Sequence, residues 1–512
     1  MSWSRFVRGL PVSEAMPYDV LPASNGEFIP REPSERQLAI MALQEQEGER
    51  VRRSLGMDRR DFVRSASAYG VGLWAISQLA PSEFGTYAGG PDQAKGTGAC
   101  DLEWPGAQLK NMPGEFIFDV QSHHVDAGGD WRVTNPGFHA FFAAVWEQSG
   151  PLGGRPSLNP DGTLRGWGEG GELDPIENLS RYHYVKELYL DSSTNMTMLS
   201  AVPSAAEYNP LPTEEAAATV QIVKKLAGGT SRAVMHAFVM PNRGSLGTGA
   251  TAAGLDPALM AHEFDLMEDA VARFGQHLRG WKVYTPWGDV PNSSGWFLDD
   301  PIGEKFIDQV RKLHRRKGGP PVIACHKGFA LPAFDQRTAL ARDIGPAARD
   351  NPDITFVVYH SGFDSETQTA YPGDAKVNSA DRGVNSFIKS LRENRWDASR
   401  FVKKGLAHGN VPNVYAEIGS TWRSVMRNAD QAAHLLGKLI THVGPQRVVW
   451  GTDSLWFGSP QSEIVALRAF KMGPKARDMY NLPYGIDGDR FDPRLDCEDA
   501  NNYRRPHPVI KD

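Results

Sequence analysis

Four short stretches of this sequence decide the fold: FIFDVQSHH (116–124), PPVIACHKG (320–328), ITFVVYHSG (354–362) and RVVWGTDSL (447–455). Each is a run rich in Val, Ile, Phe or Tyr, which is typical of a buried β-strand, and each ends in polar residues. The polar residues are Gln121 and His123, then His326, His360 and Asp453. Since they are far apart in the chain, they can meet only where many parallel strands end at one rim.

Eight segments of this apolar, β-branched kind follow residue 112. They are 116–124, 195–202, 232–240, 278–284, 322–327, 354–360, 414–418 and 448–453. The stretches between them have helical periodicity, as in 213–226, 257–274 and 302–317, with Thr213 as the expected N-cap of the first. Strands that alternate with helices predict a parallel sheet, and eight such units predict an α/β fold of the (β/α)8 TIM barrel type.

The main alternative is an open, doubly wound sheet. That fold would place a glycine-rich phosphate-binding turn after the first strand, where this chain has QSHHVDAGG instead. We therefore expect the closed barrel over residues 114–475, with long loops at 125–194 and 361–412 covering the C-terminal face.

Composition excludes some classes of protein. The chain has 512 residues, 40% hydrophobic and 23% charged, with a formal net charge of −6, so neither a basic excess nor a basic stripe points to a nucleic-acid partner. Three cysteines give no disulfide framework. No apolar run reaches the ~18 residues needed to span a bilayer, so we expect no membrane anchor.

The N-terminal region is divided by composition into a polar leader (1–56), a weakly apolar segment (57–80) and a Gly- and Pro-rich linker or arm (81–113). A C-terminal tail (476–512) follows the barrel. The segment 57–80, MDRRDFVRSASAYGVGLWAISQLA, resembles a twin-arginine export signal in its arginine pair Arg59-Arg60 and in Phe62. Its late start, Asp58 and the missing cleavage site depart from that pattern. We expect a periplasmic or exported protein; the alternative is a cytoplasmic one whose segment is an amphipathic helix.

The candidate catalytic and metal-binding side chains lie at the ends of the predicted strands. Alternate side chains of a strand share a face, so Asp119, Gln121 and His123 point one way and His124 the other. Three histidines and an aspartate at one rim suit a divalent transition metal, whereas a lone histidine at a strand end is more often structural.

At these residues the chain resembles the amidohydrolase superfamily, and within it the amidohydrolase-related branch that includes aminocarboxymuconate-semialdehyde decarboxylase. The resemblance spans about 115–470. It implies that Gln121, His123, His326 and Asp453 are the metal ligands, that Asp453 also takes a proton from water, and that His360 handles substrate or water. The implied cofactor is one divalent ion, zinc, with manganese or magnesium as alternatives.

Gln121 departs from the family, which places a histidine in that position. An amide oxygen is a weaker donor than an imidazole nitrogen, so three interpretations stay open. Gln121 is a weak ligand, or it hydrogen-bonds a water on the metal, or the site has lost its metal.

Other side chains are candidates for substrate contact or support. Lys282 would attract an anionic substrate, a carboxylated bridge being the lesser alternative, and Glu417 would accept an imidazole N–H or form a structural ion pair. Tryptophans 287, 296, 422 and 456 could line an apolar pocket.

The resemblance implies a metal-dependent hydrolase of a small organic acid, lactone, amide or ester. One alternative is non-oxidative decarboxylation of an aromatic or unsaturated acid, and another is a non-catalytic barrel with a degenerate metal site. The expected partner is a small-molecule substrate, and a homodimer through surface helices is an open alternative.

Overall fold

The computed structural model describes residues 16, 18, 33–63, 66–79, 84–87, 115–149, 175–243, 256–288, 295–329, 335–364, 383–394 and 411–480. Most of the predicted arm (88–113), the tail beyond 480, and the parts 150–174, 365–382 and 395–410 of the two long loops lie outside these ranges. No helix within the described ranges is both long enough and apolar enough to cross a membrane.

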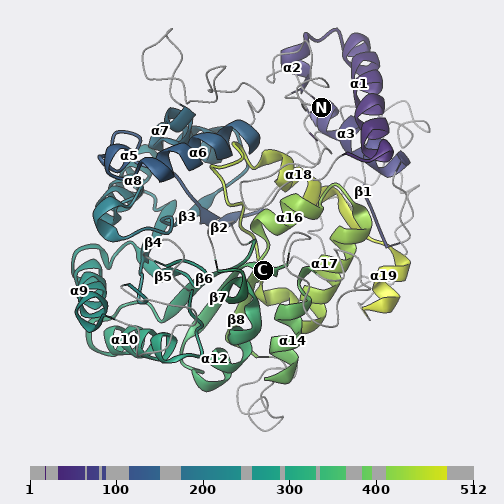
Figure 1. Cartoon of the computed structure of the whole chain (residues 1–512). Coiled ribbons are helices and arrows are strands. Elements are labelled where there is room, and N and C mark those ends of the chain that lie inside the picture. The colour runs from purple at the N-terminus through teal and green to yellow at the C-terminus, as the bar shows by residue number, and fades with distance from the viewer. Residues whose placement is uncertain are drawn as a thin grey trace.

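Eight parallel strands form the centre of the molecule, hydrogen-bonded in chain order (Figure 1). They are β2 (Phe118–Ser122), β3 (Met196–Leu199), β4 (Ala233–Phe238), β5 (Leu278–Tyr284), β6 (Val322–Gly328), β7 (Thr355–Phe363), β8 (Val414–Glu417) and β9 (Val448–Val449). The segment that begins with β9 also bonds to β2: Val120 N–H donates to Trp450 O at 2.9 Å, and Asp453 N–H donates to Gln121 O at 2.9 Å. The sheet is therefore closed, and the predicted (β/α)8 barrel and its eight strand positions are confirmed.

The helices around the barrel begin and end where the sequence signals them. α8 (Thr213–Leu226) and α9 (Pro257–Phe274) have the predicted bounds, although the N-cap of α8 is Pro212 and not Thr213. α10 (Pro301–Lys317) is capped by Asp300 and ends at Gly318, whose φ of 71° is one that glycine adopts readily. Large side chains such as Trp281, Phe306 and Phe356 fill the core.

Further helices and single helical turns lie in the connections between these strands and after the last one. They are α5 (Trp131–Thr134), α6 (Pro136–Ser149), α7 (Arg181–Val185), α11 (Gln336–Ala339), α12 (Ile344–Asp350), α14 (Asn385–Glu393), α16 (Gly419–Val425), α17 (Ala429–His442), α18 (Gln461–Ala469) and α19 (Pro474–Met479), with single turns η4 (Pro175–Leu179), η5 (Lys186–Leu190), η6 (Ala206–Tyr208), η8 (Ala341–Asp343) and η9 (Pro445–Arg447).

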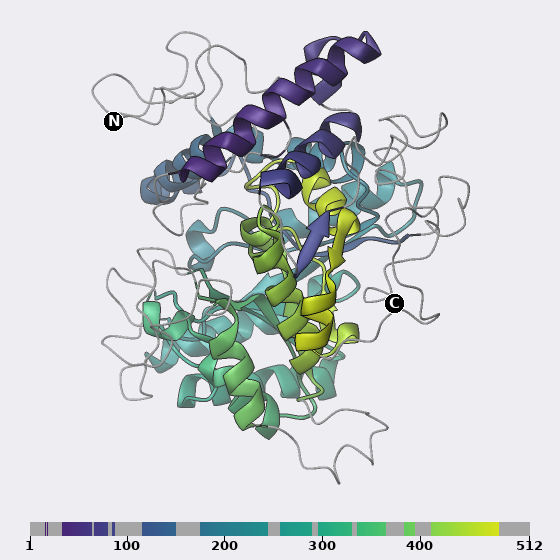
Figure 2. The ribbon, with the colours of Figure 1, turned by 90° about the vertical axis from the view of Figure 1, so that its right-hand side faces the viewer.

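An N-terminal helical unit packs beside the barrel. It comprises α1 (Glu35–Leu55), α2 (Arg59–Val63) and α3 (Ala66–Leu79), and Figure 2 shows α1 running across the top of the molecule. The leader thus contains a long helix, which begins with a capping box between Ser34 and Gln37. A short strand, β1 (Gly85–Tyr87), pairs antiparallel with β10 (Phe470–Met472) and ties this unit to the end of the barrel.

The segment that resembles an export signal forms α2 and α3 of this unit. α3 contacts α1, β1 and α18. Arg59 pairs with Glu45 at 2.5 Å, and Phe62 is fully buried in a small core with Val51 and Val71. These contacts make the segment part of the folded body in this structure.

Candidate active site

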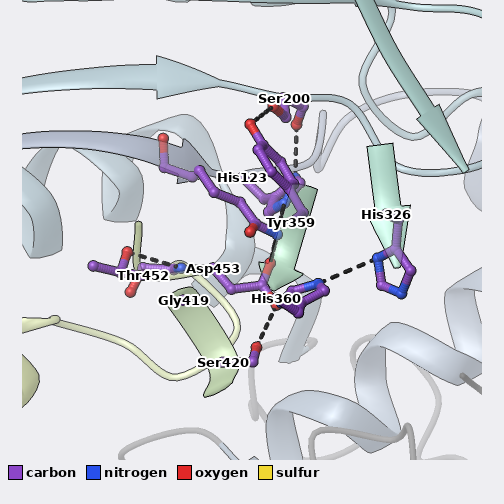
Figure 3. Close-up of polar contacts among 12 residues, drawn as sticks. His123, Ser200, His326, Tyr359, His360, Gly419, Ser420, Thr452 and Asp453 are labelled. Atoms are coloured by element: carbon purple, nitrogen blue, oxygen red, sulfur yellow. Dashed lines mark hydrogen bonds and ion pairs between the residues drawn. The ribbon is translucent and has the colours of Figure 1, made fainter. Parts of the chain in front are cut away.

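The closed barrel brings the predicted site residues to one rim. His123 follows β2, His326 lies on β6, His360 lies on β7, and Asp453 follows β9. All are 0–4% exposed. Because the first and last strands are bonded together, His123 Nε2 lies 3.1 Å from Asp453 Oδ1 (Figure 3).

Both oxygens of the Asp453 carboxylate are held by hydrogen-bond donors. Gln121 Nε2 donates to Oδ1 at 2.8 Å, and Ser420 Oγ donates to Oδ2 at 2.7 Å. Burial would raise the pKa of Asp453, but the hydrogen bond from a protonated His123 and the positive charges that His360 and His123 carry when protonated outweigh it, and the pKa lies below its usual range. Asp453 is therefore an anion with a fixed orientation.

His123 meets this anion with its second ring nitrogen. Its Nδ1 lies 2.7 Å from the carbonyl oxygen of Ser200. A carbonyl oxygen only accepts, so Nδ1 carries a proton. Nε2 faces Asp453 either with a second proton, as the donor of an ion pair, or with a lone pair. Two lone pairs 3.1 Å apart repel unless a positive charge lies with them. The pair therefore calls for either a second proton on His123 or a metal ion.

His326 and His360 form a second pair. His360 Nε2 lies 3.2 Å from His326 Nδ1, as Figure 3 shows. Burial lowers the pKa of His360 to about 4 and that of His326 well below its usual range. Both rings are neutral near pH 7, the state in which imidazole binds metals. His360 Nδ1 is buried without a hydrogen-bond partner among the described residues.

Backbone strain is concentrated at this rim. In the described part of the chain, the non-glycine residues with positive φ are Phe329, His360, Ser361 and Asp453, with φ from 35° to 60°. Such conformations cost about 1–3 kcal/mol each and persist where neighbours fix them. Three of the four are at or beside predicted site residues, so the strain marks the site independently of the side chains.

Glu417 is one of the groups that fix this backbone. Its carboxylate accepts the N–H of His360 at 2.8 Å and the N–H of Gly419. We expected Glu417 to accept an imidazole N–H or to form an ion pair; the contacts in the structure are with backbone N–H groups. Burial raises the pKa of Glu417 to about 8.

Lys282 lies on β5, and its side chain is fully buried. Its Nζ is 3.4 Å from the centre of the Tyr359 ring and 4.7 Å from that of Tyr284. The Tyr284 ring in turn stacks on His326, with centroids 5.0 Å apart. The amino group of Lys282 is thus close to the site, because only the Tyr284 ring lies between it and His326.

Sequence reasoning missed several supporting residues. Ser420 follows β8 at the same rim, so its position at a strand end could have indicated it. His236, on β4, is not among the residues singled out from the sequence, yet its Nδ1 lies 2.7 Å from Ser200 Oγ beside the site. The carbonyl of Ser200 has no sequence signal at all, because every residue has a carbonyl.

The four tryptophans divide into two groups. Trp456 stacks on His123 with ring centroids 5.3 Å apart, and Trp287 stacks on Phe138 at 5.4 Å. Trp296 and Trp422 are fully buried in the core instead.

The residues fit a divalent metal in chemistry, although not as a complete cage. Within the described ranges, no three His, Cys, Asp or Glu side chains are placed to hold an ion together. His123 and Asp453 meet, while His326 reaches His360 rather than Asp453. Gln121 Oε1 is buried and has no hydrogen-bond partner among the described residues. Neutral imidazoles, one carboxylate and a spare amide oxygen are donors that zinc or manganese accepts.

The chain matches no family model and no curated protein sequence. Among solved structures it is similar to 5-carboxyvanillate decarboxylase from Sphingomonas paucimobilis, at 12% identity over 72% of this chain and 96% of that one, with a TM-score of 0.37. A zinc-bound amidohydrolase from Burkholderia multivorans matches at 14% identity over 72% and 100%, TM-score 0.34. A manganese-bound 5-carboxyvanillate decarboxylase from Novosphingobium aromaticivorans matches at 13% identity over 73% and 98%, TM-score 0.34. At these values the likeness assigns no reaction to this chain.

Proposed function

We propose that this protein is a metal-dependent hydrolase of the amidohydrolase superfamily, acting on a small organic acid, lactone, amide or ester. One observation carries the proposal: in a buried site, His123 Nε2 lies 3.1 Å from the Asp453 carboxylate while its Nδ1 lies 2.7 Å from the carbonyl oxygen of Ser200. A divalent ion, zinc or manganese, would supply the positive charge that this pair calls for. His123 and Asp453 would hold it, with His326 and Gln121 Oε1 as further donors.

Bound here, the ion would lower the pKa of a water molecule to ~7 and polarise a substrate carbonyl. The protein supplies the rest. Asp453 accepts the proton of the attacking water, and Gln121 and Ser420 keep its two oxygens oriented during the transfer. His360 is neutral at pH 7, so it can accept that proton from Asp453 and donate it to the leaving group.

Elemental analysis and turnover test this proposal together. Protein purified without chelator should contain about one divalent ion per chain. It should hydrolyse members of a panel of small esters, lactones and amides with incorporation of ¹⁸O from labelled water. We expect His326→Ala to lose metal and activity, and Asp453→Asn to lose activity. Turnover retained in either variant contradicts the proposal, and a metal ratio near zero that reconstitution does not raise would favour the non-catalytic barrel.

Decarboxylation of an aromatic or unsaturated acid is the second candidate, and one observation favours it. The flat ring of Trp456 stacks directly on His123, and Lys282 Nζ contacts the Tyr284 ring, which itself stacks on His326. Such a site suits a planar carboxylate. Its ring–carboxylate bond would break with loss of carbon dioxide, and the electron pair left on the ring carbon would take a proton that Asp453 has first accepted from solvent. Release of carbon dioxide without ¹⁸O incorporation would select this reaction over hydrolysis.

A further inference from the structure

Five aromatic rings form one continuous stack that begins on His123. In order they are His123, Trp456, Phe142, Phe138 and Trp287. The successive centroid distances are 5.3, 5.0, 5.6 and 5.4 Å, and the interplanar angles are 15–23°. Neighbouring rings at these distances are in contact, so the stack leaves no room between its members.

The stack joins two distant parts of the barrel rim. Trp456 follows β9, and Trp287 follows β5. Phe138 and Phe142 lie four residues apart on α6, hence on the same face of that helix. α6 belongs to the connection after β2, and it spans the barrel mouth from Trp456 to Trp287.

This arrangement closes the candidate site. His123 and Asp453 are 1% and 4% exposed, so a small molecule cannot reach them without a local opening. α6 packs against α5 and η4, which belong to the same connection. Its contact with the two tryptophans of the rim is made through the rings of Phe138 and Phe142.

We propose that Phe138 and Phe142 are specificity-determining residues, and that a ligand reaches His123 by displacing Phe142 from Trp456. The proposal rests on the location of the site proposed above. A ligand with a flat, apolar face regains the stacking that the displaced ring loses, whereas a bulky or strongly hydrated ligand does not. α6 thus selects for thin, planar substrates before any chemistry takes place.

Chemical modification of histidine measures this access directly. The full chain, treated with chelator so that no ion shields the site, is reacted with diethylpyrocarbonate, and modification is followed by mass spectrometry at His326. In Phe142→Ala we expect the rate at His326 to rise by about tenfold, because the ring contact with Trp456 that joins α6 to the rim is lost. Phe138 is only partly buried, so Phe138→Ala is the second variant, tolerable for folding, and it should show a smaller rise.

Three references make the result decisive. Tyr182→Ala removes a ring that is 72% exposed on the same connection and should change nothing. His262 is exposed on α9 and should react equally in every variant. His124 is 1% exposed on the opposite face of the same strand and should stay protected.

An unchanged rate at His326 in both phenylalanine variants overturns the proposal. An equal rise at His124 also overturns it, because the whole fold would then have loosened. Metal content is measured separately, so increased access in a protein that binds no metal would sustain the role of α6 while refuting the metal-dependent function.

Discussion

Two buried aspartates allow the same substitution to be compared in two settings. Asp453 faces Nε2 of His123, and we propose that it binds a metal. Asp343 instead pairs with Lys327 Nζ at 2.8 Å, and both side chains are fully buried. Asp453→Asn and Asp343→Asn each replace one carboxylate oxygen by an NH₂ group. We expect the first to lose the stabilisation by zinc and the second to lose stability of the fold itself.

In the wild type, a free zinc concentration a hundredfold above the dissociation constant should stabilise the fold by ~2.7 kcal/mol. Asp453→Asn should lose most of this gain, since it removes the charged ligand. Asp343→Asn leaves Lys327 buried without its counter-charge, which costs about 3–5 kcal/mol. It should keep most of the zinc-dependent stabilisation, because the Lys327–Asp343 ion pair is separate from the His123–Asp453 pair, although Lys327 follows His326 in the chain.

Thermal unfolding of the three proteins, with chelator and with zinc, separates these effects. The unfolding temperature measured with chelator shows how much the Lys327–Asp343 ion pair stabilises the fold. The rise in unfolding temperature from chelator to zinc shows how much metal binding stabilises it. The reasoning fails if Asp453→Asn retains the zinc-dependent shift, or if Asp343→Asn abolishes it while still folding.

Three further predictions follow from single residues. Gln121→His should raise metal affinity, since imidazole is the stronger donor; unchanged metal content under chelator competition would place Gln121 outside the coordination sphere. Burial lowers the pKa of His124 to about 4, so the folded state binds fewer protons than the unfolded state between about pH 6.5 and 4, and stability falls as pH drops through that window. His124→Gln should reduce this fall by up to roughly 3 kcal/mol in urea titrations at pH 7 and pH 4, and an unaltered pH dependence would refute the assignment. Fused to a reporter, residues 1–90 should be exported, and lysines in place of Arg59 and Arg60 should block export; unimpaired export would exclude a twin-arginine signal.

Strand positions were predictable because barrel strands are short, apolar and β-branched, and because their ends share one rim. The same logic located His123 and Asp453 together, since closure bonds the first strand to the last. It also predicted the direction of His124, which turns outward and contacts Thr219 Oγ1 at 2.9 Å. These are properties of backbone periodicity, which a sequence carries directly.

Side-chain details were not predictable in the same way. His326 turns to His360, and Glu417 binds backbone N–H groups, because rotamers depend on neighbours contributed by other strands. The capping box at Ser34 and Gln37 was present in the sequence, but the polar composition of residues 1–56 suggested a leader and not a helix. The ring stack over His123 depends on where α6 lies in space, and no local pattern specifies that.

The central claim is that His123 and Asp453 jointly bind a divalent ion. Its most direct test is the metal content per chain of two adjacent variants, His123→Ala and His124→Gln, purified in parallel without chelator. The account predicts that His123→Ala is depleted of metal while His124→Gln keeps the wild-type ratio. Equal metal content in His123→Ala and the wild type would contradict it.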